Sequence, residues 1–349
     1  MSFVNSDNFL IFAINMSSKK NLSIETLRGI AILLVVIGHV IGSTPDGGMK
    51  IDFPHPLRYL YVWIDYIQMP LFTAIAGWVY ALKPFSHTVG FAEFARKKAL
   101  RLLVPMAVVG TIYFLVQYFM PGTNNKGELG QIWRIYPYTI YWYLPSLFLI
   151  FMIQWVIDRY KRMETFKEWC LWCFVAVMLS LVNDEGLMHS LPNLFSFKGA
   201  LGQLPYFFVG VASYRFALVV YRSQVIKCGM WIITLLGIFL IQIVYFSSAE
   251  YASLSRLLYP VTLIPCLFLL LALKWHNHFF TWIGGYAYSI YLFHGFGTSG
   301  GRIVLKMLGV KAVALIFLFA SFIATICPIA IDMLVRRFKW GRKLLLGKN

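Results

Sequence analysis

The segment ETLRGIAILLVVIGHVIG, residues 25–42, decides the fold class of this chain. It is predominantly apolar, and about 18 such residues are enough to cross a bilayer as a helix. At about 100° per residue, Arg28 and His39 lie on one helix face, roughly 16 Å apart along the axis. Glu25 lies about one turn before Arg28 on the same stripe. Because charged and titratable side chains inside a membrane helix are costly and usually face a protein interior, this helix is predicted to line a reaction or transport path.

The composition is that of a membrane protein. The 349 residues are 59% hydrophobic and 13% charged, whereas about a quarter of a soluble domain is charged. The mean hydropathy is +0.70. We therefore predict an all-α, polytopic transmembrane bundle of about ten spans. The apolar segments long enough to span are 25–43, 58–82, 99–120, 138–157, 168–183, 199–217, 228–246, 256–273, 279–297 and 310–334.

The basic residues predict the orientation of the spans. Most of the 31 Lys and Arg residues fall in alternate connecting segments, as in the positive-inside pattern, and both termini are then cytoplasmic. This pattern accounts for the net charge of +17 without a nucleic-acid partner. We expect three regions: a poorly ordered N-terminal segment (1–22), a transmembrane domain (23–335) and a basic cytoplasmic tail (336–349).

A basic cluster precedes a proline in ARKKALRLLVP, residues 95–105. It contains Arg96, Lys97, Lys98 and Arg101, and the i, i+3 and i, i+4 spacings direct pairs of these cations to one side of a helix. Two interpretations stay open. The cluster either anchors a cytoplasmic loop or forms a phosphate site in which Arg and Lys hold a nucleotide-bearing donor.

Other polar and aromatic residues are weaker candidates. Asp65 and Gln68, at i, i+3, either bind a sugar or form a structural pair. Trp142 lies among Tyr136, Tyr138, Tyr141 and Tyr143, which form either an interfacial aromatic belt or a sugar-binding mouth. The histidines and cysteines predict no metal site.

Several stretches resemble motifs of one family in the same order along the chain. ETLRGIAILLVVIGH resembles the opening helix of the acyltransferase 3 family of integral membrane O-acyltransferases. Over residues 22–335 the chain is most similar to small sugar O-acetylases without an appended domain. The further motifs are MPLFTAIAGWVY (69–80), KKALRLLVP (97–105), WYLPSLFLIF (142–151) and IGGYAYSIYLFH (283–294), which ends in His294.

The resemblance implies a reaction and a place for it. The reaction is transfer of an acyl group, most often acetyl, from cytosolic acetyl-CoA to a hydroxyl of a cell-envelope carbohydrate. The acceptor is a polysaccharide or a lipid-linked sugar, and the membrane is a bacterial-type cytoplasmic (inner) membrane. No metal is implied, and the sequence makes no prediction of oligomeric state.

The resemblance also implies roles for the candidate residues. His39 would take the proton of the acceptor hydroxyl, either in direct transfer or in a two-step reaction. Arg28, oriented by Glu25, would hold the donor or stabilise the thioester oxyanion. The remaining candidates would bind the substrates: Arg96, Lys97, Lys98 and Arg101 the CoA phosphates, and Asp65, Gln68, Trp142 and His294 the sugar.

The alternative is a secondary transporter of a small polar or anionic solute. Ten spans with an intramembrane Arg, Glu and His would also suit a transporter. Transporters, however, usually carry paired repeats with broken helices in both halves. No such pairing is visible in this sequence, so an enzyme is favoured.

Overall fold

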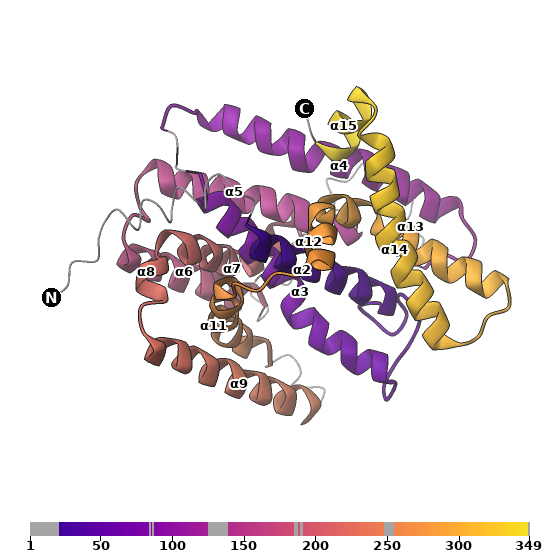
Figure 1. Ribbon diagram of the computed structural model, residues 1–349, viewed down its shortest axis with the longest axis horizontal. Coiled ribbons are helices and arrows are strands. Elements are labelled where there is room, and N and C mark those ends of the chain that lie inside the picture. The colour runs from indigo at the N-terminus through magenta and orange to yellow at the C-terminus, as the bar shows by residue number, and fades with distance from the viewer. Residues whose placement is uncertain are drawn as a thin grey trace.

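The computed structural model describes residues 21–83, 85, 87–124, 139–184, 188, 191–247 and 255–347. The described residues form helices and no strand, which confirms the predicted all-α class. The predicted poorly ordered segment lies outside the described residues up to position 20. The helices (Figure 1) are α2 (Leu22–Ile41), α3 (Pro56–Ala81), α4 (Phe91–Phe119), η2 (Thr139–Tyr141), α5 (Tyr143–Arg159), α6 (Phe166–Asp184), η3 (Leu194–Ser196), α7 (Phe197–Arg215), α8 (Ala217–Val220), α9 (Gln224–Ser247), η4 (Ser255–Leu257), α11 (Leu258–Ala272), α12 (His278–Gly285), α13 (Ala287–Met307), α14 (Val313–Val335) and α15 (Lys339–Leu346).

Six of the described helices are long and apolar enough to cross a membrane, as a multi-pass membrane protein requires. They are α2, α4, α6, α9, η4 with α11, and α14. Among the other predicted spans, α5 has only 17 residues, and α3 carries Arg58 and Asp65. The count of ten spans and the sides of the two termini stay predictions.

The ninth predicted span, 279–297, is two helices. The chain leaves helical geometry at Tyr286 (φ −109°, ψ 4°), where α12 ends and α13 begins. Gly284 and Gly285 precede the break, and glycine is a poor helix former. The short helix α12 is thereby free to cross α2, while α13 continues as a separate helix that pairs with α14.

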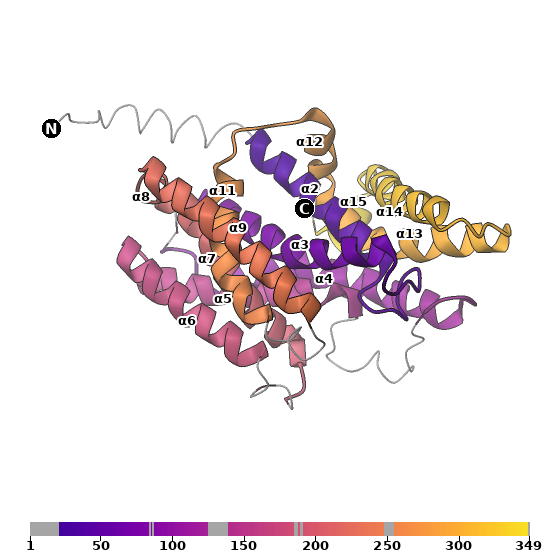
Figure 2. The same cartoon turned by 90° about the horizontal axis from the view of Figure 1, so that it is seen from below.

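The helix α2 lies inside the bundle and α9 at its edge (Figures 1 and 2). In α2, 67% of the apolar window is buried, against 11% in α9. The outward side chains of α9 include Trp231, Leu235 and Phe239, which are exposed and apolar. A helix that exposes such side chains is suited to face lipid, whereas the buried polar groups of α2 face protein.

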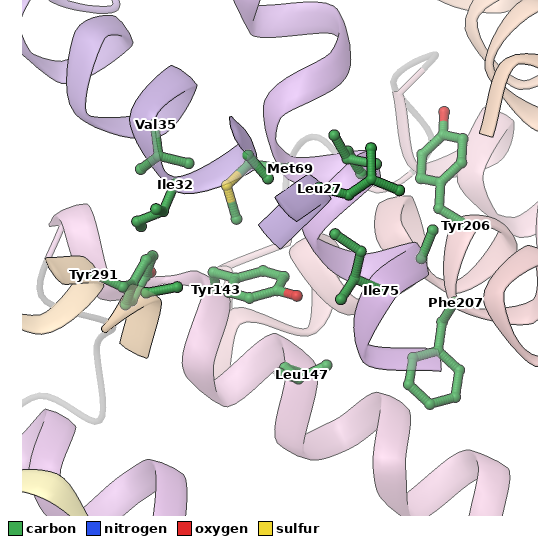
Figure 3. Close-up of a cluster of buried hydrophobic side chains, with 14 of the residues drawn as sticks. Leu27, Ile32, Val35, Met69, Ile75, Tyr143, Leu147, Tyr206, Phe207 and Tyr291 are labelled. Atoms are coloured by element: carbon green, nitrogen blue, oxygen red, sulfur yellow. The ribbon is translucent and has the colours of Figure 1, made fainter. Parts of the chain in front are cut away.

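The core is built from side chains of α2, α3, α5, α7 and α13 (Figure 3). Ile32 and Val35 of α2 belong to the same buried cluster as Tyr143 and Tyr291. These four side chains are all nearly inaccessible. The polar face of α2 is therefore held against a packed apolar wall, which fixes the rotation of the helix.

Two glycines bring the backbones of α2 and α12 into contact. A Cβ placed on Gly29 would lie 1.9 Å from the carbonyl oxygen of Phe280. A Cβ on Gly284 would lie 2.1 Å from the carbonyl oxygen of Glu25. Small residues at a membrane helix crossing permit this close approach. The crossing sets the distance between Arg28 and α12.

Gly29→Ala is therefore expected to lower the stability of the protein. The added methyl group would force the two backbones apart, and overpacking of this kind costs typically about 1–3 kcal/mol. The measurement is thermal unfolding of the purified protein in detergent, followed by circular dichroism. Gly300→Ala is the matched control, because nothing lies within 4 Å of a Cβ at that position. Equal unfolding temperatures for the two variants would contradict the close crossing.

Candidate active site

Glu25, Arg28 and His39 are all on α2, whose first turn is fixed by the Asn21 side chain. That side chain accepts hydrogen bonds from the backbone N–H groups of Ser23 and Ile24. Arg28 forms an ion pair with Glu25 one turn earlier. The pairing that their spacing predicts is thus present in the structure.

Arg28 also joins α2 to α12. Its Nε donates a hydrogen bond to the carbonyl oxygen of Gly284 at 2.9 Å. The terminal Nη2 is the atom that contacts Glu25. One planar guanidinium therefore makes two directed contacts at once, and it is only partly exposed. Arg101 of α4 lies close enough for its charge to act on Arg28, so the two helices place cations at one end of the bundle.

The ring of His39 lies against the ring of His294. Their centroids are 4.8 Å apart, and the ring planes are tilted by 45°. His294 is fully buried on α13. The structure thus brings together two candidates whose proximity the sequence does not predict.

Hydrogen bonding fixes the tautomer of neutral His294. Its Nδ1 lies 2.7 Å from the carbonyl oxygen of Tyr291 and 3.2 Å from that of Ile290. Carbonyl oxygens only accept, so Nδ1 carries the proton and Nε2 keeps a free lone pair. Within the described part of the chain, Nε2 is buried and has no hydrogen-bond partner. Its lone pair can accept a hydrogen bond.

Gln68 of α3 lies beside the turn of α2 that carries His39, and Asp65 is its hydrogen-bond partner. The Gln68 amide nitrogen and the Tyr61 hydroxyl each donate to Asp65 Oδ1 at 3.0 Å. A Cβ on Gly38, next to His39, would lie 2.8 Å from Gln68 Oε1. That oxygen is buried and unpartnered among the described residues, whereas Asp65 is exposed. The Asp65–Gln68 pair therefore extends from the turn that carries His39 to an exposed position on α3.

Tyr291, which was not among the candidates, lies next to His294, and Tyr143 lies next to Tyr291. The Tyr291 ring is 5.8 Å from His294, and Tyr143 is 5.9 Å from Tyr291 (Figure 3). The Tyr143 hydroxyl lies 3.3 Å from that of Thr73, which lies 3.0 Å from Gln203 Oε1. Tyr143 lies in the motif WYLPSLFLIF (142–151) and Tyr291 in IGGYAYSIYLFH (283–294), so membership in these family motifs was the sequence signal that could have identified them.

Trp142 has a different environment. Its ring packs against Gly199 of α7, where a Cβ would lie 2.6 Å from Trp142 Cε3. Tyr141 and Tyr143 are buried in the core, so an interfacial belt does not describe them. Tyr136 and Tyr138 lie outside the described residues.

The four cations of the basic cluster do not act as one group. Lys98 turns inward, with Nζ 3.5 Å from the centroid of the Phe151 ring. Lys97 is exposed and pairs with Glu93 at 2.6 Å. Arg96 and Arg101 are also exposed. Lys98 is thus the member that lies toward the interior, and Arg101 is the exposed member whose charge acts on Arg28.

An ion pair that the sequence did not predict lies at the same end of the bundle. Arg215 of α7 holds both carboxylate oxygens of Asp158 of α5, at 2.6 and 2.7 Å. The Tyr80 hydroxyl donates to the same carboxylate at 2.8 Å. A cavity of about 250 Å³ opens beside this pair, and Lys83 and Lys161 are among its lining residues. The lining also includes Glu164, so the cavity carries carboxylates as well as the cations Lys83, Lys161 and Arg215.

Nothing in the described ranges resembles a metal centre. Among those residues, no group of three or more His, Cys, Asp and Glu side chains is placed to hold a metal ion. The five cysteines are free.

Comparison with known proteins identifies the family. A family model described as an acyltransferase domain (acyltransferase 3) matches residues 21–333. The chain belongs to the acyltransferase 3 family. The match begins at the residue that caps α2 and ends within α14, so it includes every candidate residue named above. No curated protein and no solved structure matches the chain. The motif resemblance is confirmed, and the protein is a membrane acyltransferase.

Proposed function

We propose that this acyltransferase moves an acetyl group from acetyl-CoA to a hydroxyl of a cell-envelope carbohydrate. One observation carries the proposal: α2 aligns Arg28 with His39, and the ring of His39 lies 4.8 Å from that of His294. Neutral imidazole is the commonest general base in proteins. The proposed path runs from the cation-rich end of α2 to the histidine pair.

His39 is the proposed base. It removes the proton of the acceptor hydroxyl while the hydroxyl oxygen attacks the thioester carbonyl carbon. The C–S bond then breaks, the new C–O ester bond remains, and the CoA thiolate leaves with a proton. In a two-step route the acetyl group is first transferred covalently to His39 and then to the acceptor. The net bonds formed and broken are the same, and the same residues take part. In either route Arg28 stabilises the negative charge on the carbonyl oxygen or holds the donor, and Glu25 orients it.

The donor is proposed to bind at the end of the bundle where Arg28 and Arg101 lie. Lys98 and Arg101, together with Lys83 and Lys161 of the cavity beside Asp158, offer cations for the CoA phosphates. Arg96 and Lys97 lie at the exposed side of the same helix and would add long-range attraction. The acyl arm of CoA is long and flexible, so it can carry the thioester from this end toward His39. The basic character of this end supports its cytoplasmic location in a bacterial-type inner membrane.

The acceptor is proposed to approach through Asp65 and Gln68. Asp65 is exposed, and the unpartnered Gln68 Oε1 lies beside the turn that holds His39. Together with His294 Nε2 these atoms accept hydrogen bonds, which matches the hydroxyl groups of a sugar. Trp142 is left out of this proposed surface because its ring packs on α7.

The reaction is tested with purified protein. We expect acetyl-CoA consumption that increases when a carbohydrate acceptor is added, with acetate recovered as a sugar ester. Mass spectrometry of envelope glycans from cells with and without the protein then identifies the acceptor. Acetyl-CoA consumption that does not change with the acceptor, together with no sugar ester among the products, would contradict the proposal.

Neutralising Lys98 and Arg101 of the basic cluster is expected to weaken donor binding. In the Lys98→Gln/Arg101→Gln double variant, acetyl-CoA should bind at least about tenfold more weakly, because a hydrogen bond to a charged group is worth about 1.5–3 kcal/mol. The Kd is measured on inside-out membrane vesicles. Arg222→Gln/Lys274→Gln removes the same charge from two exposed positions and is the control. Unchanged acetyl-CoA affinity in the Lys98→Gln/Arg101→Gln variant would mean that the cluster serves only to orient the chain in the membrane.

A further inference from the structure

A second cavity, lined by cations, lies at the end of the bundle opposite Arg28. Its volume is about 380 Å³, and Arg302, Lys306 and Lys311 line it together with apolar side chains such as Met49 and Ile316. It lies between the loop that follows α2 and the turn between α13 and α14. At about 30 Å³ per water molecule, it has room for a phosphate group with an attached sugar or glycerol.

The charges around this cavity are of one sign. Three cations line it, and no carboxylate does so in the part of the chain that the structure describes. Arg302 and Lys306 are one helical turn apart on α13, and Lys311 follows the turn at Gly309. Like charges brought together repel one another. Three cationic side chains around one cavity are stabilised when an anion is bound there.

The location of these cations is also unusual for this chain. Met49 donates its backbone N–H to the carbonyl oxygen of Ile41 at 3.1 Å, which places the cavity at the C-terminal end of α2. Most basic residues gather at the other end, as the positive-inside pattern favours. The anchoring of cytoplasmic loops by basic residues therefore does not explain the three cations at this end of the bundle.

The wall of the cavity is held rigidly. Arg302 is buried, and its Nη1 donates to the carbonyl oxygen of Gly48. Asn124 donates to the same oxygen at 3.1 Å. Arg58 fixes the rest of the loop through the carbonyl oxygens of Gly42 and Ile51. A site that is ordered before binding loses less entropy when it takes its ligand.

We infer that this cavity binds a phosphate group carried by a phospholipid or by a carbohydrate. Guanidinium and ammonium groups together hold phosphate by charge-assisted hydrogen bonds. Along α13, Arg302 is roughly 12 Å beyond His294. A phosphate on an acceptor chain bound at Arg302 would thus lie within a few sugar rings of the histidine pair. Binding itself is independent of acyl transfer; only the assignment of the phosphate to the acceptor rests on the proposed function.

The test measures binding and not transfer. The full-length protein, purified in neutral detergent, is titrated with glucose 1-phosphate and with glucose. In a second arm it is placed in nanodiscs with phosphatidylglycerol or with diacylglycerol, and retained lipid is measured by native mass spectrometry. The variant is Lys306→Gln/Lys311→Gln, at two exposed positions, so that the buried Arg302 stays in place. The charge-matched control is Arg222→Gln/Lys274→Gln.

Each outcome bears on the inference. We expect at least one phosphate-bearing probe to bind in preference to its neutral counterpart, and to bind about tenfold or more weakly to the Lys306→Gln/Lys311→Gln variant only. Lipid retention alone identifies a headgroup site, and sugar-phosphate binding identifies an acceptor site. Equal binding to both variants, or no preference for phosphate in either arm, overturns the inference. Phosphate binding by a protein that shows no acyl transfer in the acetyl-CoA assay would contradict the proposed function and leave this inference standing.

Discussion

His39→Gln is expected to lower acyl transfer by about 10²–10⁴-fold, the usual contribution of a positioned general base. The glutamine amide can still form hydrogen bonds, but it has no basic nitrogen to take the proton of the acceptor. His39 lies against the buried His294 ring. Insertion of the chain into the membrane should not change, because replacing an imidazole in an apolar helix adds no charge. The assay is carbohydrate acetylation at matched membrane expression.

Two further variants separate chemistry from packing. His39→Ala removes both the base and the hydrogen-bonding group, and its activity should be as low as that of His39→Gln or lower. His278→Gln changes an exposed histidine at the start of α12 and should leave turnover near normal. Near-normal turnover in His39→Gln would make His39 a packing residue and would refute the proposed mechanism.

The sequence predicts the local part of the site and not its long-range part. Glu25, Arg28 and His39 are on one helix, so their spacing alone places them on one stripe. The ring contact between His39 and His294 depends on where α13 begins. That start is set by the break at Tyr286, and hydrophobic periodicity did not reveal it because the residues on both sides are apolar.

The basic cluster shows how a correct helix prediction can still misjudge side chains. Lys97 and Lys98 are neighbours, but successive helical residues point about 100° apart. Lys97 meets Glu93 one turn earlier, whereas Lys98 meets the ring of Phe151. Which neighbour a cation meets depends on the helix beside it, and the sequence does not specify that helix.

The ion pair of Asp158 and Arg215 had no local signal. Asp158 lies in the last turn of α5 and Arg215 ends α7, and the two meet only because those helices finish at the same end of the bundle. Trp142 is the opposite case. Its motif pointed to the acceptor, but the adjacent Tyr143 turns toward Tyr291, while Trp142 turns toward Gly199.

Arg28→Lys should lower turnover strongly while leaving the fold intact. The guanidinium makes two contacts at once, from Nε to the Gly284 carbonyl oxygen and from Nη2 to Glu25. A lysine ammonium keeps the charge but lacks the planar fork, so it can keep the Glu25 pair only by giving up the directed bond to α12. Because that bond holds the cation in place against α12, the charge would no longer be fixed relative to the thioester carbonyl.

We expect a loss of about 10²–10³-fold in kcat, the usual effect of removing one donor that stabilises an oxyanion. If Arg28 acts on the transition state, kcat and kcat/KM fall together, whereas a pure donor-binding role raises KM with little change in kcat. Thermal unfolding in detergent checks that the variant is folded. Arg222→Lys, at an exposed position, is the matched control. Full activity in Arg28→Lys would show that charge alone suffices at this position, and the planar geometry of the arginine would then have no part in the reaction.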